Sequence, residues 1–344
     1  MKPLLLLSTL HRDHAAHSGY QALAEALQSL PEARFLHTIR ADPAGGLPLF
    51  AARVARRFAF SRWYLGGCAA LEARAWREMR NGFSGIVHSM WADHDLGFLD
   101  LLIDRRRHRL VGSFHNCDDT FVHTIRFPRR LRRFDAIILM SRTQERFFLD
   151  AGVPAGRIHV VLHGVNTAYY RPGGETAPGF TVLAAGGYRR NFPLLREVCL
   201  LLRDTPSIRF DILAPEAQRR LFTDLPNARF HATLGDAEYL AALQSSSCLL
   251  QTVENATANN VILESMACGL PVVAEKVGGI PEYVDPSCSI LTAPGDAAAL
   301  AAALVELEKN PARRASLSAG ARAHAEKLDW KAVAAQMCAI YEAL

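Results

Sequence analysis

Short, mainly apolar runs alternate along the chain with longer amphipathic segments. In the first half, apolar runs occupy residues 4–9, 85–90, 109–114 and 136–141. A pattern typical of an amphipathic helix occupies residues 20–30. Short runs with few polar positions are typical of strands buried on both faces, and such strands separated by helices form parallel sheets. The first half is therefore predicted to be a doubly wound α/β domain.

The same alternation restarts in the second half. Residues 159–166 complete the first series, and residues 169–179 then contain two prolines and three glycines without periodicity, which is typical of a linker. Strand-like runs follow at residues 180–187, 208–215, 228–232, 248–252 and 271–275. Two doubly wound domains are therefore predicted, over residues 1–170 and 176–328. The amphipathic end, residues 329–344, is predicted to be a helix that packs back on the first domain.

Composition limits the class of protein. The chain has 344 residues, of which 50% are hydrophobic and 21% charged, as in ordinary globular proteins with room for two cores. The apolar run at the start is too short for a signal peptide, and no run reaches the length of a membrane span. Seven scattered cysteines without a Cys-x-x-Cys pair suit neither a disulfide framework nor a structural zinc site. A cytoplasmic protein is expected, either soluble or peripheral at the inner face of the membrane.

Basic residues are concentrated in the first half. Residues 1–172 hold 24 Lys and Arg against 15 Asp and Glu, whereas the remainder holds 15 against 19. The excess lies in three arginine-rich segments, 53–63, 105–109 and 126–133. Such segments attract phosphate on an anionic membrane, a lipid-linked acceptor or nucleic acid, although a solvated surface is an equally good interpretation. Nucleic acid is not favoured, because no recognised binding motif accompanies the arginines.

Polar residues follow the ends of several predicted strands. The irregular segment 254–260 leads into a predicted helix that contains Glu264. The start of a helix offers unpaired N–H groups and a positive dipole end, which favour an anionic or hydroxyl-rich ligand. The Glu254 and Glu264 carboxylates can accept from sugar hydroxyls, and Asn259 and Asn260 can also donate. Alternatively, Asn259 or Asn260 caps the helix and Glu264 is solvated.

Three segments of the chain resemble the corresponding segments of the family 4 retaining glycosyltransferases of GT-B fold. Residues 253–284 are similar to the family's donor-nucleotide segment, and residues 134–172 resemble the end of its first domain. Residues 184–190 lie where the family opens its second domain with a phosphate-binding loop. The resemblance implies two Rossmann-like domains facing a cleft. It also implies transfer of a sugar from a nucleotide-diphosphate sugar to a hydroxyl of a glycan, lipid-linked or small-molecule acceptor, without a further cofactor.

The resemblance implies roles for particular residues. Glu264 matches the carboxylate that holds the ribose hydroxyls of the donor. Arg189 and Arg190, which follow Gly187, match the cations that neutralise the departing diphosphate, so no metal ion is required. His115, at the end of a predicted strand, matches a histidine that hydrogen-bonds the donor sugar.

Position 256 departs from the family pattern. The family has a second carboxylate eight residues before the ribose carboxylate, facing the donor sugar, whereas this chain has Ala256. Glu254 is expected to replace it, with Thr257, Asn259, Asn260 and the loop backbone as alternatives. The departure leaves open a non-catalytic nucleotide-sugar-binding or partner subunit of the same fold. A nicotinamide oxidoreductase is not favoured, because no G-x-G-x-x-G follows the first strand of either domain.

Two further loops follow predicted strands of the first domain. Gly19 is expected to let the backbone approach the acceptor closely, as the family's glycine-rich loop does. The spacing of His11, His14 and His17 suggests a metal, but no fourth ligand is evident, so no metal site is predicted. Residues 91–95 either contact the acceptor or form a turn.

Overall fold

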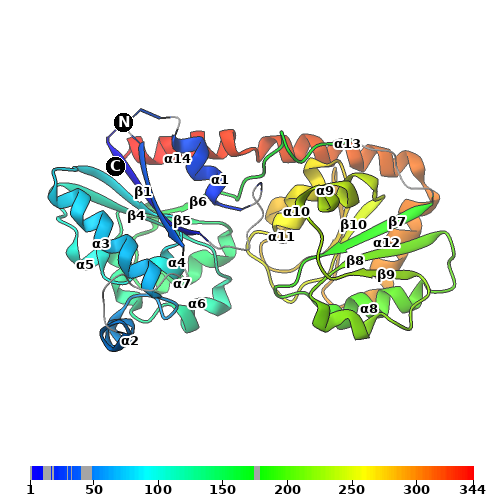
Figure 1. Cartoon of the computed structure of the whole chain (residues 1–344). Coiled ribbons are helices and arrows are strands. Elements are labelled where there is room, and N and C mark those ends of the chain that lie inside the picture. The colour runs from blue at the N-terminus through cyan, green and yellow to red at the C-terminus, as the bar shows by residue number, and fades with distance from the viewer. Residues whose placement is uncertain are drawn as a thin grey trace. The chain divides into compact units, whose positions relative to one another are not determined.

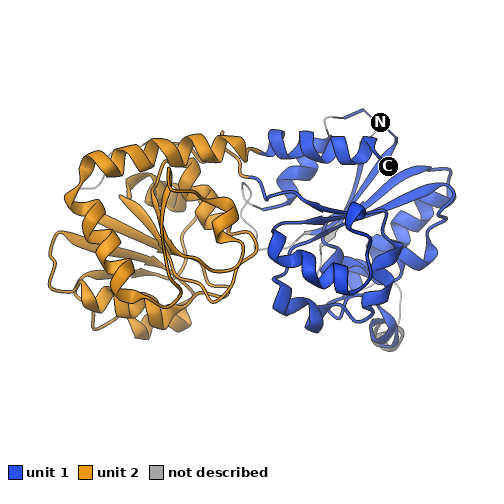
Figure 2. Cartoon of the chain, turned by 180° about the vertical axis from the view of Figure 1, so that it is seen from behind, with its two compact units in different colours: residues 1–164, 330–344 blue, residues 165–329 orange. Residues whose placement is uncertain are grey.

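The protein is described here by a computed structural model that covers residues 2–10, 17, 19–28, 30–31, 33–39, 49–173 and 179–344. Its contacts divide the chain into two units (Figure 2), unit 1 with residues 1–164 and 330–344, and unit 2 with residues 165–329. The chain passes from unit 1 to unit 2 after Gly164, which lies before the predicted linker, because the residues after Gly164 pack on unit 2. Tyr170 is buried, and Arg322 Nη1 donates to its carbonyl at 3.1 Å.

The described part of unit 1 contains a six-stranded parallel sheet in the order β2-β1-β3-β4-β5-β6 (Figure 1). Its strands are β1 (Leu4–Leu10), β2 (Ala33–Ile39), β3 (Gly85–Ser89), β4 (His108–Phe114), β5 (Ala136–Leu139) and β6 (Ile158–Val160). Its helices are α1 (Gln21–Gln28), α2 (Leu49–Phe58), α3 (Gly66–Arg80), α4 (Ala92–Asp95), α5 (Leu99–Leu102), α6 (Asp118–Thr124), α7 (Glu145–Asp150) and α14 (Trp330–Glu342). Every residue of β3 and β5 is buried, as expected for strands covered on both faces.

The described part of unit 2 contains a second six-stranded parallel sheet, in the order β12-β11-β10-β7-β8-β9. Its strands are β7 (Phe180–Ala185), β8 (Ile208–Leu213), β9 (Ala228–His231), β10 (Cys248–Gln251), β11 (Val272–Glu275) and β12 (Ser289–Thr292). Its helices are α8 (Phe192–Leu201), α9 (Asp236–Ser245), α10 (Asn260–Ala267), α11 (Ile280–Tyr283), α12 (Ala297–Lys309) and α13 (Pro311–Lys327). Apolar side chains of α8 and α12 form one buried cluster with those of the sheet. The prediction of two doubly wound domains is confirmed.

The strand order places a candidate binding position in each unit. Strand order reverses between β1 and β3 in unit 1 and between β7 and β10 in unit 2. Ligands of open parallel sheets bind beyond the carboxyl ends of the strands at such a reversal. In unit 2 this position is bordered by residues 186–191 and 252–259, which include most of the residues that the sequence singled out.

The apolar runs did not reveal two strands, β2 and β12. Both lie at the edge of a sheet, where one side of the strand has no neighbour. Polar residues interrupt or flank the apolar ones in both strands and several positions are only half-buried, so neither strand has the continuous apolar run of a central strand. In the part of the chain that the structure describes, no helix combines the length and apolar character needed to cross a membrane.

A buried chain of polar contacts fixes the C-terminal helix to unit 1. Helix α14 lies beside α1 (Figure 1), and its Tyr341 hydroxyl contacts His88 Nδ1 at 2.7 Å. His88 Nε2 contacts the Ser113 hydroxyl at 2.8 Å, and that hydroxyl contacts the Tyr20 hydroxyl at 2.9 Å. All four side chains are buried, so each depends on the others for its hydrogen bonds.

Replacing Tyr341 by Phe should therefore destabilise the protein. The substitution keeps the ring but leaves His88 Nδ1 without its partner, at a cost of about 1 to 3 kcal/mol in the free energy of unfolding. Denaturant unfolding of the variant measures this cost. The matched control is Tyr188→Phe, because Tyr188 is 69% exposed and its hydroxyl can bond to water. Equal stability of the two variants would contradict the role given to the buried chain.

Candidate functional site

In unit 2, the loops after β7 and β10 are joined by hydrogen bonds. The Asn191 N–H donates to the Thr252 carbonyl at 3.1 Å, and the Thr252 hydroxyl donates to the Asn191 carbonyl at 3.0 Å. The Glu254 N–H donates to the Arg189 carbonyl at 3.0 Å. A small, open depression between the ends of the two strands is lined by Gly186, Arg190 and Gln251. The strand reversal therefore brings Arg189, Arg190 and Glu254 together at one end of the sheet.

Arg190 folds inward and binds only uncharged groups. Its Nε donates to the Ala185 carbonyl at 2.9 Å, and its Nη1 donates to the Tyr188 carbonyl at 3.2 Å. When the Gln251 amide is turned so that its oxygen faces the guanidinium, that oxygen accepts from Arg190 Nη2 at 3.0 Å. Burial lowers the pKa of Arg190 to about 10. Since Arg190 forms no ion pair with any residue that the structure describes, its positive charge is uncompensated within the described protein.

The loop after β7 is constrained at three positions, Gly186, Gly187 and Arg189. Arg189 has φ +53°, the one positive φ of a non-glycine residue in the described part of the chain. Such strain is often found at functional sites. A Cβ at Gly186 would clash with the Arg190 guanidinium, and one at Gly187 would lie 2.7 Å from Pro215 Cγ. The Gly187 that the sequence singled out is thus required for packing of the loop.

Asn259 is the N-cap of α10. Its side-chain oxygen accepts from the Ile262 N–H at 3.3 Å and lies 3.5 Å from Arg190 Nη2. The capping alternative therefore accounts for Asn259, while Asn260 is the first residue of the helix and is half-buried. Thr257 is buried in the same loop. The positive end of the α10 dipole thus lies beside the Arg190 charge, and both favour an anion.

Glu264 is buried in the second turn of α10. The alternative that left it solvated is wrong, since 4% of its surface is exposed. Its carboxylate accepts from the Tyr239 hydroxyl of α9 at 2.7 Å. Burial and the neighbouring Glu264 carboxylate raise the pKa of Tyr239 well above its usual value, so the phenol stays neutral and donates. A ligand hydroxyl would have to share this carboxylate with Tyr239.

The loop exposes residue 254 and buries residue 256. Glu254 is exposed, whereas 8% of the surface of Ala256 is accessible. The Ala256 carbonyl accepts from the Gly279 N–H at 2.8 Å, and a Cβ at Gly278 would clash with that carbonyl. The turn at Gly278 and Gly279 therefore holds the loop closely. Of the two positions, Glu254 is the one that presents a carboxylate to solvent.

In unit 1, His115 follows β4 and is neutral. Its Nε2 lies 2.8 Å from the Met90 carbonyl, so Nε2 carries the proton and Nδ1 is the acceptor. Burial lowers the pKa of His115 to about 4. The backbone N–H of His115 donates to Asp93 Oδ2 at 2.9 Å, and this bond fixes the turn after β4. The ring stacks on Trp91 at 3.9 Å between centroids.

The segment 91–95 forms the turn that the sequence left open, and its contact with an acceptor stays a prediction. Asp93 and Asp95 are buried, and Asp95 accepts from the Thr9 N–H at 2.9 Å, so these carboxylates form the turn. Trp91 and His94 are only half-buried and share an edge-to-face contact with rings 5.8 Å apart. They present aromatic surface at the end of the sheet.

The other predicted residues of unit 1 have simpler surroundings. Gly19 has φ +92°, which favours glycine, and a Cβ there would meet no heavy atom within 4 Å. His17 lies in a turn. His11 and His14 lie outside the described residues.

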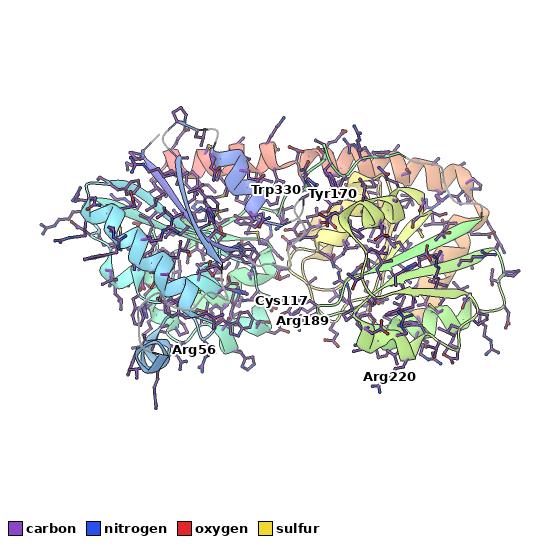
Figure 3. The ribbon with its side chains drawn as sticks, in the orientation of Figure 1. Arg56, Cys117, Tyr170, Arg189, Arg220 and Trp330 are labelled. Atoms are coloured by element: carbon purple, nitrogen blue, oxygen red, sulfur yellow. The ribbon has the colours of Figure 1, made fainter. Side chains whose placement is uncertain are left out.

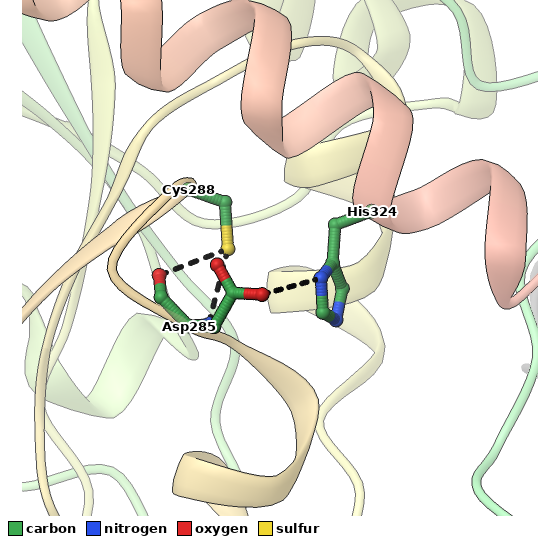
Figure 4. Close-up of side chains that lie close together, drawn as sticks. All are labelled: Asp285, Cys288 and His324. Carbon is green, nitrogen blue, oxygen red and sulfur yellow. Dashed lines mark hydrogen bonds and ion pairs between the residues drawn. The ribbon is translucent and has the colours of Figure 1, made fainter.

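One group of three possible metal ligands exists among the described residues, Asp285, Cys288 and His324 (Figure 4). Asp285 Oδ1 accepts from the Ser287 N–H at 2.8 Å, the Cys288 thiol donates to the Asp285 carbonyl at 3.3 Å, and His324 Nδ1 lies 3.3 Å from Asp285 Oδ2. These contacts show that the three residues hold a turn against α13, which explains why they lie close together. None of the three belongs to the loops after β7 and β10.

Sequence reasoning missed two residues that shape the site in unit 2. Gln251 contacts Arg190, and Tyr239 contacts Glu264. Gln251 ends a wholly buried strand, and a polar residue at such a position was a usable signal. The sequence around Tyr239 gave no such signal, because the contact of Tyr239 with α10 arises only in the folded unit.

The chain matches two family models. Residues 20–169 match the one described as Glycosyltransferase Family 4, and residues 179–310 match the one described as Glycosyl transferases group 1. A D-inositol 3-phosphate glycosyltransferase of Streptomyces scabiei is 26% identical over 322 residues, which cover 78% of this chain and 70% of that protein. The corresponding protein of Saccharomonospora viridis is 30% identical over 213 residues, or 54% of this chain and 49% of that protein. The chain thus spans about half the length of several curated relatives.

Solved structures share the fold over the whole chain. Sucrose-phosphate synthase from Thermosynechococcus elongatus has a TM-score of 0.72 at 20% identity, covering 99% of this chain and 98% of that one. Anabaena Alr3699/HepE in complex with UDP-glucose has a TM-score of 0.69 at 18% identity, covering 99% of both chains. Two parallel sheets and these likenesses define the GT-B fold. The chain belongs to the family 4 glycosyltransferases, and the assignment made from its motifs is confirmed.

The buried histidines of unit 1 predict a pH effect on stability. Burial lowers the pKa of His163 to about 4, well below the 6.5 of an unfolded histidine. Between these values only the unfolded state binds the proton, so this contribution to the free energy of unfolding falls as pH is lowered from about 6.5 to about 4. Burial also lowers the pKa of His88 and His115, whereas it raises the pKa of Asp93, which acts in the opposite direction.

The variant His163→Asn isolates one such contribution. Its amide N–H can replace the bond from His163 Nδ1 to the Gly164 carbonyl, 2.8 Å long, but it does not titrate. The loss of unfolding free energy between about pH 7 and about pH 5 should be smaller in the variant than in the wild type. The exposed His123→Asn is the control and should behave like the wild type. An identical pH dependence of all three proteins would contradict the assignment.

Proposed function

We propose that the protein is a retaining glycosyltransferase that moves a sugar from a nucleotide-diphosphate sugar to an acceptor hydroxyl. The observation that carries the proposal is Arg190, a half-buried guanidinium without an ion-pair partner among the described residues, beside the N-terminus of α10. A buried charge is costly unless an opposite charge accompanies it. A diphosphate group would supply that charge.

The proposed mechanism follows the charge that develops during transfer. As the bond between the anomeric carbon and the phosphate oxygen breaks, negative charge grows on the diphosphate. Arg189, Arg190 and the first N–H groups of α10 would stabilise this charge, without a divalent ion. The acceptor oxygen bonds to the anomeric carbon on the face that the diphosphate leaves, and its proton passes to a phosphate oxygen.

Three other residues would bind the donor and its sugar. We assign the ribose hydroxyls to Glu264, which would accept from them beside Tyr239. Glu254 is assigned to the transferred sugar, because its carboxylate is exposed in the same loop. His115 would accept from a sugar hydroxyl through Nδ1, and with its lowered pKa it would be a hydrogen-bonding group at neutral pH.

The donor and acceptor classes are also proposals. The likeness to a protein solved with UDP-glucose supports a nucleotide-sugar donor. Unit 1, with its basic excess and aromatic surface, would take a saccharide or lipid-linked acceptor. Relatives named for inositol 3-phosphate support a phosphate-bearing acceptor. Peripheral contact of a cytoplasmic protein with an anionic membrane is the corresponding proposal for its location.

A second candidate is a non-catalytic subunit that binds nucleotide sugars. It is favoured by Ala256, because the carboxylate that family members have at this position is missing. Such a subunit would bind the donor through the same arginines and release no diphosphate.

Incubation with a panel of nucleotide sugars tests the proposed function. At least one donor should release its nucleoside diphosphate, and EDTA should leave the rate unchanged. Arg190→Lys, which keeps the charge but loses the fork of donors, should lower the rate by about tenfold or more. The control is Arg220→Lys, at an exposed arginine of the same unit (Figure 3). Donor binding without diphosphate release would favour the non-catalytic subunit, and a metal-reversible loss with EDTA would contradict the role of the arginines.

A further inference from the structure

Two groups of arginines in unit 1 differ in their ion-pair partners, and the first group has such partners inside the unit. Arg105 Nη2 pairs with Asp135 Oδ1 at 2.7 Å. Arg130 and Arg133 both pair with the buried Asp100 carboxylate. Three arginines of segments 105–109 and 126–133 therefore form ion pairs that hold the unit together.

The second group consists of Arg56, Arg57, Arg62 and Arg126. None of the four forms an ion pair with a residue that the structure describes. Arg56, Arg57 and Arg62 are exposed, and Arg126 is half-buried. Arg56 lies at the end of α2 (Figure 3), and its Nε donates to the Arg62 carbonyl at 3.2 Å.

Backbone pairing brings this second group together from two separate segments. The Arg62 N–H donates to the Thr124 carbonyl at 2.7 Å, and the Arg126 N–H donates to the Phe60 carbonyl at 2.9 Å. Between these bonds, Ser61 and Ile125 form an isolated antiparallel bridge. The end of α2 and the residues after α6 are therefore held side by side.

The positive charges of these four arginines repel one another. Burial lowers the pKa of Arg126, and the charges of Arg62, Arg56 and Arg57 lower it further. Arg126 Nε is buried and has no hydrogen-bond partner in the described structure. Like charges without a carboxylate between them raise the free energy of the folded unit, and a bound anion would remove that cost.

We propose that Arg56, Arg57, Arg62 and Arg126 form a binding site for a phosphate ester. Guanidinium groups bind phosphate through paired, charge-assisted N–H···O bonds, and Arg126 Nε–H is a donor that lacks an acceptor. The inference rests on the proposed function in one respect, because it assigns the phosphate to the acceptor. Phe58 and Phe127, 58% and 37% exposed, flank the arginines. The phosphate can therefore belong to a lipid headgroup or to a free phosphorylated molecule.

Binding of inorganic phosphate to the full-length protein tests the site. The double variant Arg62→Gln/Arg126→Gln should bind phosphate about tenfold more weakly than the wild type, in titrations against chloride at equal ionic strength. The matched control is Arg77→Gln/Arg106→Gln, which removes the same charge from exposed arginines elsewhere on unit 1. The control should bind as the wild type does, and thermal unfolding in chloride verifies that both variants are folded.

A second measurement distinguishes the two sources of phosphate. Vesicles of phosphatidylcholine with and without phosphatidylglycerol are sedimented with the same three proteins. The cluster variant is Arg62→Gln/Arg126→Gln. If it no longer binds the anionic vesicles while the control variant still does, the result supports the site with a lipid headgroup as its ligand. If the cluster variant loses phosphate binding and the wild type binds no vesicles, the result supports the site with a free phosphorylated molecule as its ligand. Equal behaviour of the cluster and control variants in both measurements would overturn the proposal.

Titration with UDP separates this inference from the proposed function. The arginine cluster belongs to unit 1, whereas the residues assigned to the donor diphosphate and ribose belong to unit 2. If the inference alone is wrong, UDP still binds and the cluster and control variants are alike toward phosphate. If the proposed function is wrong, no nucleotide sugar releases diphosphate from the wild type, while the phosphate result is unaffected.

Discussion

The contact of Arg190 with the ends of β7 and β10 is the interaction on which the candidate donor site depends. Its guanidinium donates to the Ala185 carbonyl and lies within reach of the Asn259 cap of α10, so one side chain links both loops and the helix start. The glycine at 186 leaves the space that the guanidinium fills. Carbonyl and amide oxygens cannot neutralise the charge of Arg190, and the proposed diphosphate would do so. The site is therefore built around a charge that the described protein leaves uncompensated.

Much of the fold could be predicted from the sequence, for a physical reason. Central strands of a parallel sheet are buried on both faces, so β3, β5 and β10 appear as apolar runs. Edge strands such as β2 and β12 lack this signal, because half of their surroundings is solvent or loop. The prolines and glycines of residues 169–179 indicate an irregular backbone, but they could not show that Tyr170 is buried.

The candidate site could be predicted in part. Motif spacing and strand ends located Arg190, Asn259 and Glu264, since loops at a strand reversal are drawn together by topology. Spacing could not show that Glu264 bonds to Tyr239, because that contact joins two helices. Nor could it separate the paired Arg130 from the unpaired Arg126, although the two lie four positions apart in one basic segment. Pairing is decided by tertiary contacts, and it changes an arginine from a structural group into a possible ligand.

The most direct test of the central claim is the affinity of UDP and GDP for two variants, measured by titration calorimetry. Glu264→Ala should weaken binding of the preferred diphosphate by about 1.5 to 3 kcal/mol, the contribution of a charge-assisted hydrogen bond. Glu254→Ala should leave it unchanged, because a nucleoside diphosphate lacks the sugar that Glu254 is assigned to bind. Unchanged affinity in a folded Glu264→Ala variant would contradict the account of unit 2 as the donor site.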